Sequence, residues 1–140
     1  MIFVKIMQHF IGKPFKAGGF GQGGGFDCLG FVVAFQAMRG INMPRHFAQY
    51  DEQNYSELYL NDREKAEDIL IEYLNSFAMQ IDIKHILAGD IILFKSDKDQ
   101  LRFVAIYLGN NQYASSFINH GVQIFGLDDK TIPILAWRVK

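Results

Sequence analysis

The spacing of apolar residues changes at Gly89-Asp90, from a helical period before this point to a strand period after it. In segments 28–39 and 62–77, apolar residues recur every three or four positions, as in helices that cover a core. Beyond Gly89-Asp90 the alternation predicts strands at residues 91–95, 101–108, 112–118, 122–127 and 134–140. The links between them are too short for crossover helices, so the sheet should be antiparallel. We therefore predict an α+β fold, with N-terminal helices packed on a C-terminal antiparallel sheet of about five strands.

The length of the chain predicts one domain. Its 140 residues lie within the usual range of about 100–200 per domain, so we predict a single domain over residues 1–140. Residues 1–11 are predicted to form a short amphipathic helix that Gly12 and Pro14 end. Because Lys5, Gln8 and His9 interrupt its apolar run and it lacks a small-residue cleavage site, we expect neither a signal peptide nor a membrane span there. The lack of a signal favours residence in the cytoplasm.

Composition excludes several classes of protein. With 49% hydrophobic residues and a formal net charge of −1, the chain differs from disordered segments and from nucleic-acid-binding proteins, which carry a basic surplus. The single cysteine, Cys28, can form neither an internal disulfide nor a cysteine-based zinc site. Gly19-Phe-Gly-Gln-Gly-Gly24 fits the G-x-G-x-x-G pattern, but it follows a predicted helix instead of a strand, so we expect no dinucleotide. We predict no cofactor and no metal.

Cys28 lies in the first turn of the second predicted helix. Asp27 before it is a favourable N-cap residue. The positive end of the helix dipole favours the thiolate, which is the nucleophilic form, and the glycines of residues 18–25 would let a substrate backbone approach closely. Free cysteine is also among the most buried residue types, which makes a structural thiol the alternative. Position alone leaves both interpretations open.

Several short motifs occur in the order and spacing of a known family. They are Ile11-Gly-Lys-Pro-Phe15, Gly18-Gly19, Phe26-Asp-Cys-Leu-Gly-Phe-Val32, Gly40-Ile-Asn-Met-Pro-Arg45, Ala88-Gly-Asp-Ile-Ile-Leu-Phe94 and Phe103-Val-Ala-Ile-Tyr-Leu-Gly109. Over nearly the whole chain this pattern resembles the NlpC-type, papain-like cell-wall peptidases. Gln49-Tyr50 and Ala136-Trp-Arg138 are similar to the branch found in phage tails and gene-transfer agents. The resemblance implies a papain-like NlpC-type fold and an endopeptidase that cuts D-amino-acid-containing peptide stems of peptidoglycan.

The resemblance also implies site residues, and here the sequence departs from the family. Cys28 matches the nucleophile. The family's base is the His that opens the motif His-Val-x-Ile-Tyr-Leu-Gly, and Phe103 stands at that position. A phenyl ring accepts no proton, so the general base is missing. The residue that orients the base falls on Tyr113, or on Ser115 if no gap is allowed, and Phe15 stands where a substrate-contacting Tyr is common.

A catalytic reaction would need another histidine as base. His120, in the last predicted hairpin turn, is the best substitute, although it is displaced along the sheet from Phe103. His46 follows the far end of the cysteine helix, which places it about 18 Å from Cys28 at a helical rise of about 1.5 Å per residue. Two further histidines are expected at the surface or at an interface, His9 and His85.

Three functions follow from these observations. We favour a catalytically impaired member that binds a peptide, a cell-wall fragment or a protein partner in the former cleft, because loss of the base costs about 10²–10⁴-fold in rate. The second is an active cysteine hydrolase or acyltransferase that uses Cys28 with a non-standard base. The third is a structural component of a phage-like particle, which could carry a chain made in the cytoplasm to the cell envelope.

Overall fold

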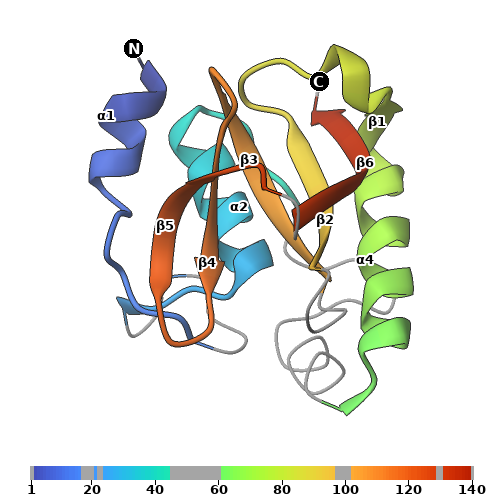
Figure 1. The fold of residues 1–140 in the computed structure, drawn as a ribbon, viewed down its shortest axis with the longest axis horizontal. Coiled ribbons are helices and arrows are strands. Elements are labelled where there is room, and N and C mark those ends of the chain that lie inside the picture. The colour runs from blue at the N-terminus through green and yellow to red at the C-terminus, as the bar shows by residue number, and fades with distance from the viewer. Residues whose placement is uncertain are drawn as a thin grey trace.

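One sheet forms the centre of the protein, and helices lie along it (Figure 1). The computed structural model describes residues 2–16, 21, 24–44, 61–96, 102–128 and 131–139. The helices are α1 (Ile2–Gln8), α2 (Cys28–Met38), α4 (Arg63–Phe77) and the one-turn helix η2 (Ile83–His85). The strands are β1 (Ala78–Ile81), β2 (Ile91–Ser96), β3 (Arg102–Gly109), β4 (Gln112–Phe117), β5 (Gly121–Gly126) and β6 (Thr131–Val139). None of the helices described is long and apolar enough to span a membrane.

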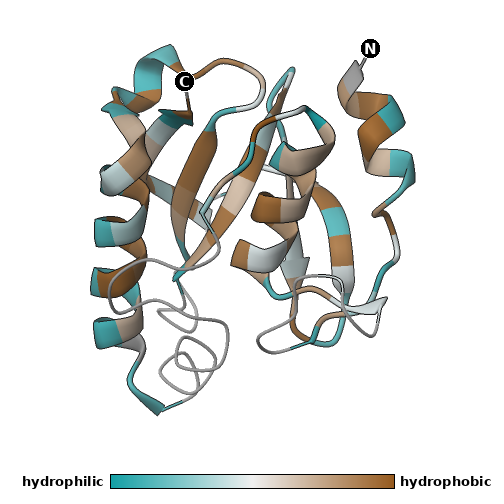
Figure 2. Ribbon diagram, turned by 180° about the vertical axis from the view of Figure 1, so that it is seen from behind, coloured by the Kyte–Doolittle hydropathy of each residue, from teal (hydrophilic) through white to brown (hydrophobic). Residues whose placement is uncertain are grey.

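The second helix, α2, is buried on most of its circumference. Asp27 caps it, and its carboxylate accepts a hydrogen bond from the Gly30 N–H at 2.6 Å. The helix packs against β3 and β4, and Figure 2 shows hydrophobic residues along most of its length. After the helix the chain turns at Gly40, whose φ of 81° is a left-handed conformation that glycine tolerates. The helix predicted over 28–39 is confirmed, and it ends at Met38.

The sheet has six strands in the order β1-β6-β2-β3-β4-β5, and every neighbouring pair is antiparallel. The predicted α+β class is confirmed, but the expected count of about five strands omitted β1. This strand follows α4 directly, and its residues are half-buried at both ends and exposed between them. Four residues with that pattern lack the alternation that identifies a strand from sequence. The last strand, β6, lies between β1 and β2.

The core consists of two clusters, one on each face of the sheet. Neighbouring residues of β2 show the division, since Leu93 belongs to the cluster under the helices and Phe94 to the cluster on the opposite face. The second cluster contains several aromatic rings, with Tyr113 packed edge-on against Phe94 at a centroid distance of 5.1 Å. The ring of Phe103, on β3, contacts residues of both clusters.

The amphipathic helix α4 covers one side of the sheet. Asp62 caps it by accepting a hydrogen bond from the Lys65 N–H at 3.2 Å. Tyr73 is fully buried, and Figure 2 shows hydrophilic residues on the outward side of the helix. From this helix, the Glu67 carboxylate pairs with Arg102 at the start of β3. The helix predicted over residues 62–77 is confirmed. Its ion pair connects it to β3, the strand that carries Phe103.

Candidate active site

Cys28 occupies the first position of α2, and its side chain is only 3% exposed. The pKa of its thiol is raised to about 12, first by burial and second by the negative charge of Asp27. Hydrogen bonds from the backbone N–H groups of Val104, Leu29 and Cys28 itself lower the pKa without offsetting burial. The helix position had suggested a stabilised thiolate. The thiol instead stays protonated at neutral pH, because loss of hydration outweighs the backbone hydrogen bonds that favour the thiolate.

Strand β3 reaches the thiol one residue after position 103. The backbone N–H of Val104, the next residue, bonds to Cys28. The ring of Phe103 stacks on the ring of Phe94 at a centroid distance of 5.4 Å. It packs edge-to-face with the ring of Phe117 at a centroid distance of 5.2 Å. The position that the resemblance assigns to the base therefore holds an aromatic ring fixed by other rings, which cannot take a proton from the thiol.

A cavity of about 370 Å³ opens beside Phe103. It is lined by Phe15, Phe103, Ser116, Phe117, Ile118, His120, Gln123, Phe125, Gly126, Asp128 and Thr131. Phenyl rings form its apolar wall, and the polar side chains provide hydrogen-bonding groups. Cys28 is not among the described residues that line it. The volume is that of a small-ligand site, which is typically about 300–1,000 Å³.

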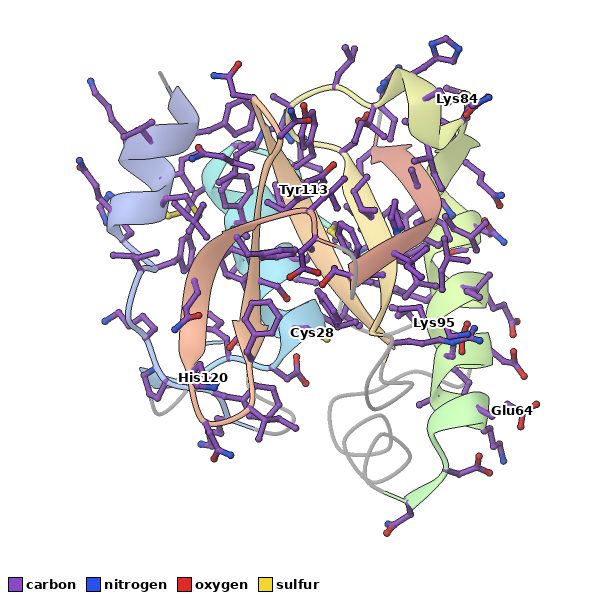
Figure 3. All side chains as sticks on the ribbon, in the orientation of Figure 1. Cys28, Glu64, Lys84, Lys95, Tyr113 and His120 are labelled. Carbon is purple, nitrogen blue, oxygen red and sulfur yellow. The ribbon has the colours of Figure 1, made fainter. Side chains whose placement is uncertain are left out.

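His120 lies in the turn between β4 and β5 and lines the same cavity as Phe103. Its side chain is exposed, and its backbone N–H donates to the Phe117 carbonyl at 3.1 Å. Figure 3 shows His120 and Cys28 toward the same end of the fold, with His120 on the turn and Cys28 at the start of α2. The structure thus brings His120 to the cavity but leaves the thiol outside its lining.

The other histidines of the described chain lie away from this cavity. His9 follows α1 and His85 ends η2, and both are exposed. Other positions raised by the sequence lie outside the described residues, namely Gly18-Gly19, His46 and Gln49-Tyr50. Within the described part of the chain, no group of three or more His, Cys, Asp or Glu side chains could hold a metal ion.

Tyr113 and Ser115, the two candidates for orienting a base, are engaged elsewhere. The Tyr113 ring lies in the aromatic cluster on the sheet face opposite the helices, stacked on Phe125 at 5.7 Å. Burial, and secondly the nearby Tyr107, raise the pKa of Tyr113, so its hydroxyl stays neutral. The Ser115 hydroxyl is fully buried and donates to the Val104 carbonyl at 2.7 Å. The structure does not bring either side chain into the cavity.

Ser116, which the sequence did not single out, positions the segment in front of the cysteine. Its hydroxyl donates to the Phe26 carbonyl at 2.8 Å, and the same carbonyl accepts the Lys16 N–H at 3.1 Å. Phe26 also pairs with Phe15 in a parallel β-bridge. These bonds hold the chain two residues before Cys28 against β4. The Tyr-Ala-Ser-Ser stretch contains two adjacent serine hydroxyls, and only the strand register distinguishes their roles.

The Gly-Asp motif before β2 has a structural role. The buried carboxylate of Asp90 accepts hydrogen bonds from the Leu87 N–H at 2.7 Å and from Arg138 Nε and Nη2 at 3.0 and 2.8 Å. The Gln36 side chain on α2 donates to the Gly89 carbonyl at 3.0 Å. The motif therefore joins the cysteine helix, the start of β2 and the final strand.

Comparison with known proteins identifies the family. The sequence model of the NlpC/P60 family matches residues 12–134. The chain belongs to the NlpC/P60 family. The "Probable endopeptidase NlpC" of Escherichia coli is 29% identical over 125 residues, which are 88% of this chain and 65% of that protein. Its homolog in Haemophilus influenzae is 25% identical over 126 residues, 89% of this chain and 53% of that protein. The chain thus spans less than two thirds of the length of either relative.

Solved structures of NlpC/P60 proteins share the fold. A Bacillus cereus family member has a TM-score of 0.62 at 22% identity, covering 98% of this chain and 39% of its own. The P60 domain of a Mycobacterium avium paratuberculosis antigen has a TM-score of 0.61 at 20% identity, covering 99% and 91%. RipD of Mycobacterium tuberculosis, described as a non-catalytic NlpC/p60 domain protein adapted to peptidoglycan binding, has a TM-score of 0.56 at 19% identity, covering 99% and 95%. These likenesses confirm the predicted NlpC-type fold.

The turn that carries His120 depends on Gly121. Its φ is 73°, and a Cβ there would lie 2.3 Å from the Lys13 carbonyl oxygen. We expect Gly121→Ala to lower the free energy of unfolding by about 2 kcal/mol or more, since left-handed strain and a backbone clash add. Gly40→Ala is the matched control, because φ is 81° and no atom lies within 4 Å of its added Cβ. Urea unfolding followed by circular dichroism would measure both variants, and equal losses would contradict the clash.

Proposed function

We propose that this domain binds a peptide of the peptidoglycan-stem class in the cavity beside Phe103, with the family's peptidase activity lost or greatly reduced. The proposal rests on two features that occur together. The thiol of Cys28 is buried and its pKa is about 12, and position 103 holds a phenyl ring. A cysteine peptidase needs a thiolate and a group that protonates the leaving amine. These two residues supply neither.

The cavity supports binding independently of catalysis. Its phenyl rings offer apolar contact to side-chain methyl groups, while Gln123 and Thr131 offer hydrogen bonds to a peptide backbone. The fold likeness to RipD is consistent with this role, since that protein is described as non-catalytic and adapted to peptidoglycan binding. The names of the two relatives, which describe them as a probable endopeptidase and its homolog, also support a peptide as the ligand.

One observation favours a second function, an active cysteine hydrolase. His120 lines the cavity together with Phe103, so an imidazole is present at the cleft. For His120 to serve as base, the Cys28 thiol would have to become exposed and meet it. Reactivity of the thiol therefore distinguishes the two functions.

Alkylation of Cys28 by iodoacetamide between about pH 6 and about pH 10 tests the state of the thiol. We expect slow alkylation without a plateau in this range, because burial raises the pKa of Cys28 to about 12. The chain unfolded in guanidinium is the control, and its thiol should titrate near the ordinary value of about 8.5. A plateau below that value that disappears in His120→Ala would establish the active hydrolase instead.

Binding is tested by NMR titration with soluble muropeptides. We expect chemical-shift changes at cavity residues such as Gln123 and Thr131, and no cleavage of the added peptide. The Phe125→Asp variant should lose these chemical-shift changes. The Ile132→Asp variant should retain them, because Ile132 is an exposed apolar residue that does not line the cavity. An unchanged spectrum with the folded wild-type protein would refute the binding role.

A further inference from the structure

A second cavity, of about 400 Å³, lies between α1 and the turn that joins β3 to β4, with Ile124 of the edge strand β5 at its border. It is lined by Phe3, Val4, Met7, Gln8, Ile11, Leu108, Gly109, Asn110, Gln112 and Ile124. Figure 1 shows α1 at the same side of the molecule as the edge strand β5 and level with the turn that joins β3 to β4. Several of the lining side chains are apolar and exposed, with Val4 61%, Ile11 50% and Ile124 43% accessible. We call this cavity the α1–β5 groove.

The backbone of β5 presents hydrogen-bonding groups toward this side. The Val122 N–H donates to the Lys13 carbonyl at 2.9 Å, and the Val122 carbonyl accepts the Gly12 N–H at 3.1 Å. Val122 therefore directs its backbone groups away from β4, and alternation along the strand gives Ile124 and Gly126 the same direction. Within the part of the chain that the structure describes, no hydrogen bond reaches the outward N–H or carbonyl of Ile124.

The chain itself begins a ladder on this edge and then leaves it. Gly12 and Lys13 run antiparallel to β5 at Val122, and the residues before them turn away into α1. The α1–β5 groove borders Ile124, the next residue of β5 whose backbone groups point outward. An extended segment placed there would lie about 4.8 Å from β5, the usual spacing of paired strands. One row of its side chains would contact Val4 and Ile11.

We propose that the edge of β5 binds an extended polypeptide segment as an added strand, with apolar side chains at alternate positions and acidic residues at its flanks. Main-chain hydrogen bonds to Ile124 and Gly126 would hold the segment, and the apolar groove would select its alternate side chains. Charge argues for the acidic flanks. The N-terminal stretch through Lys13 carries Lys5 and Lys13 but no carboxylate, and β5 carries no charge. This site shares Gly126 with the cavity beside Phe103, whereas the residues that line the α1–β5 groove are all different from those of that cavity.

The test uses the whole chain and a synthetic peptide that alternates valine with threonine and has glutamate at both ends. We expect hydrogen exchange of the Ile124 and Gly126 amides to slow at least about tenfold on saturation, because both become hydrogen-bonded. The control peptide has the same sequence with N-methyl groups on alternate residues, so that it cannot complete the ladder. Protection that is equal with both peptides, or absent at millimolar peptide, would overturn the proposal.

Two variants locate the binding. Ile124→Pro removes an outward N–H from an edge strand and leaves the bonds to β4, which Gln123 and Phe125 make. We expect it to weaken peptide binding about tenfold or more, the equivalent of about 1.4 kcal/mol. Val4→Asp should weaken binding through charge repulsion and a polar group in the groove, whereas Met79→Asp, an exposed apolar residue on the far edge strand β1, should not. Equal binding by Val4→Asp and wild type would place the peptide elsewhere and refute the groove.

A second copy of this chain is the competing occupant of the edge. Light scattering over a range of protein concentrations distinguishes it from a peptide. We expect a monomer that binds the peptide without changing its oligomeric state. A dimer that forms without peptide and dissociates in Ile124→Pro would show that β5 pairs with its own copy, and would overturn the proposal.

Discussion

Phe103→His is expected to turn this domain into a measurable peptide hydrolase. The substitution introduces an imidazole one residue before Val104, whose backbone N–H bonds to Cys28. A nearby imidazole favours the thiolate and can protonate the leaving amine, and a positioned general base contributes about 10²–10⁴-fold in rate. We expect an increase of that order over wild type in the release of amino groups from peptidoglycan stem peptides. Alkylation of Cys28 should accelerate in parallel.

The controls separate chemistry from changes in packing. Phe103→Leu removes the same ring and should stay inactive, while Phe103→His combined with Cys28→Ala should lose the gained activity. Because Phe103 is half-buried between two clusters, circular dichroism and thermal unfolding must first show that each variant folds. A folded but inert Phe103→His protein would contradict the correspondence between position 103 and the family's base.

Trp137→Ala is expected to have the largest effect on stability. Trp137 on β6 is fully buried, and its Nε1–H donates to the Asn75 side chain on α4 at 2.8 Å. Removal of a buried Trp costs about 3–5 kcal/mol. Against a typical domain stability of about 5–15 kcal/mol, this loss would bring the protein close to unfolding at ambient temperature. Urea unfolding should be followed by far-ultraviolet circular dichroism, because the chain has a single Trp and its fluorescence would be lost.

Asn75→Ala separates the hydrogen bond from the packing of the ring. It leaves the indole N–H without its acceptor but keeps the ring in place, and we expect a loss of about 1–2 kcal/mol. If Asn75→Ala destabilises the protein as much as Trp137→Ala does, the ring contributes little through its packing, contrary to its complete burial.

The elements with strong local patterns could be predicted from the sequence. The α2 helix has a capping Asp27 and a left-handed Gly40 at its ends, and these local signals define its span. The β1 strand has no such signal, because its four residues gain a partner only when β6 folds beside them. A strand without alternation is determined by tertiary pairing and not by its own sequence.

The candidate site could be predicted only in part, for a related reason. Motif order located Cys28 and position 103, and the hydrogen bond from the Val104 N–H to Cys28 shows that β3 reaches the thiol one residue after position 103. The burial of the thiol could not be predicted, since it depends on packing between α2 and β3. The role of Ser116 was likewise hidden, because only its contact with the distant Phe26 distinguishes it from Ser115.

The place of β6 between β1 and β2 determines when the sheet can be completed. During synthesis, α4 with β1 and the meander β2–β5 emerge first, yet neither group pairs with the other until residues 131–139 arrive between them. Until then the apolar edge of β2 has no partner and can pair with another chain. Pairings between residues so distant in sequence also form slowly. The chain should therefore depend on rapid completion of its last strand, and partly synthesised chains should be the species most prone to aggregate.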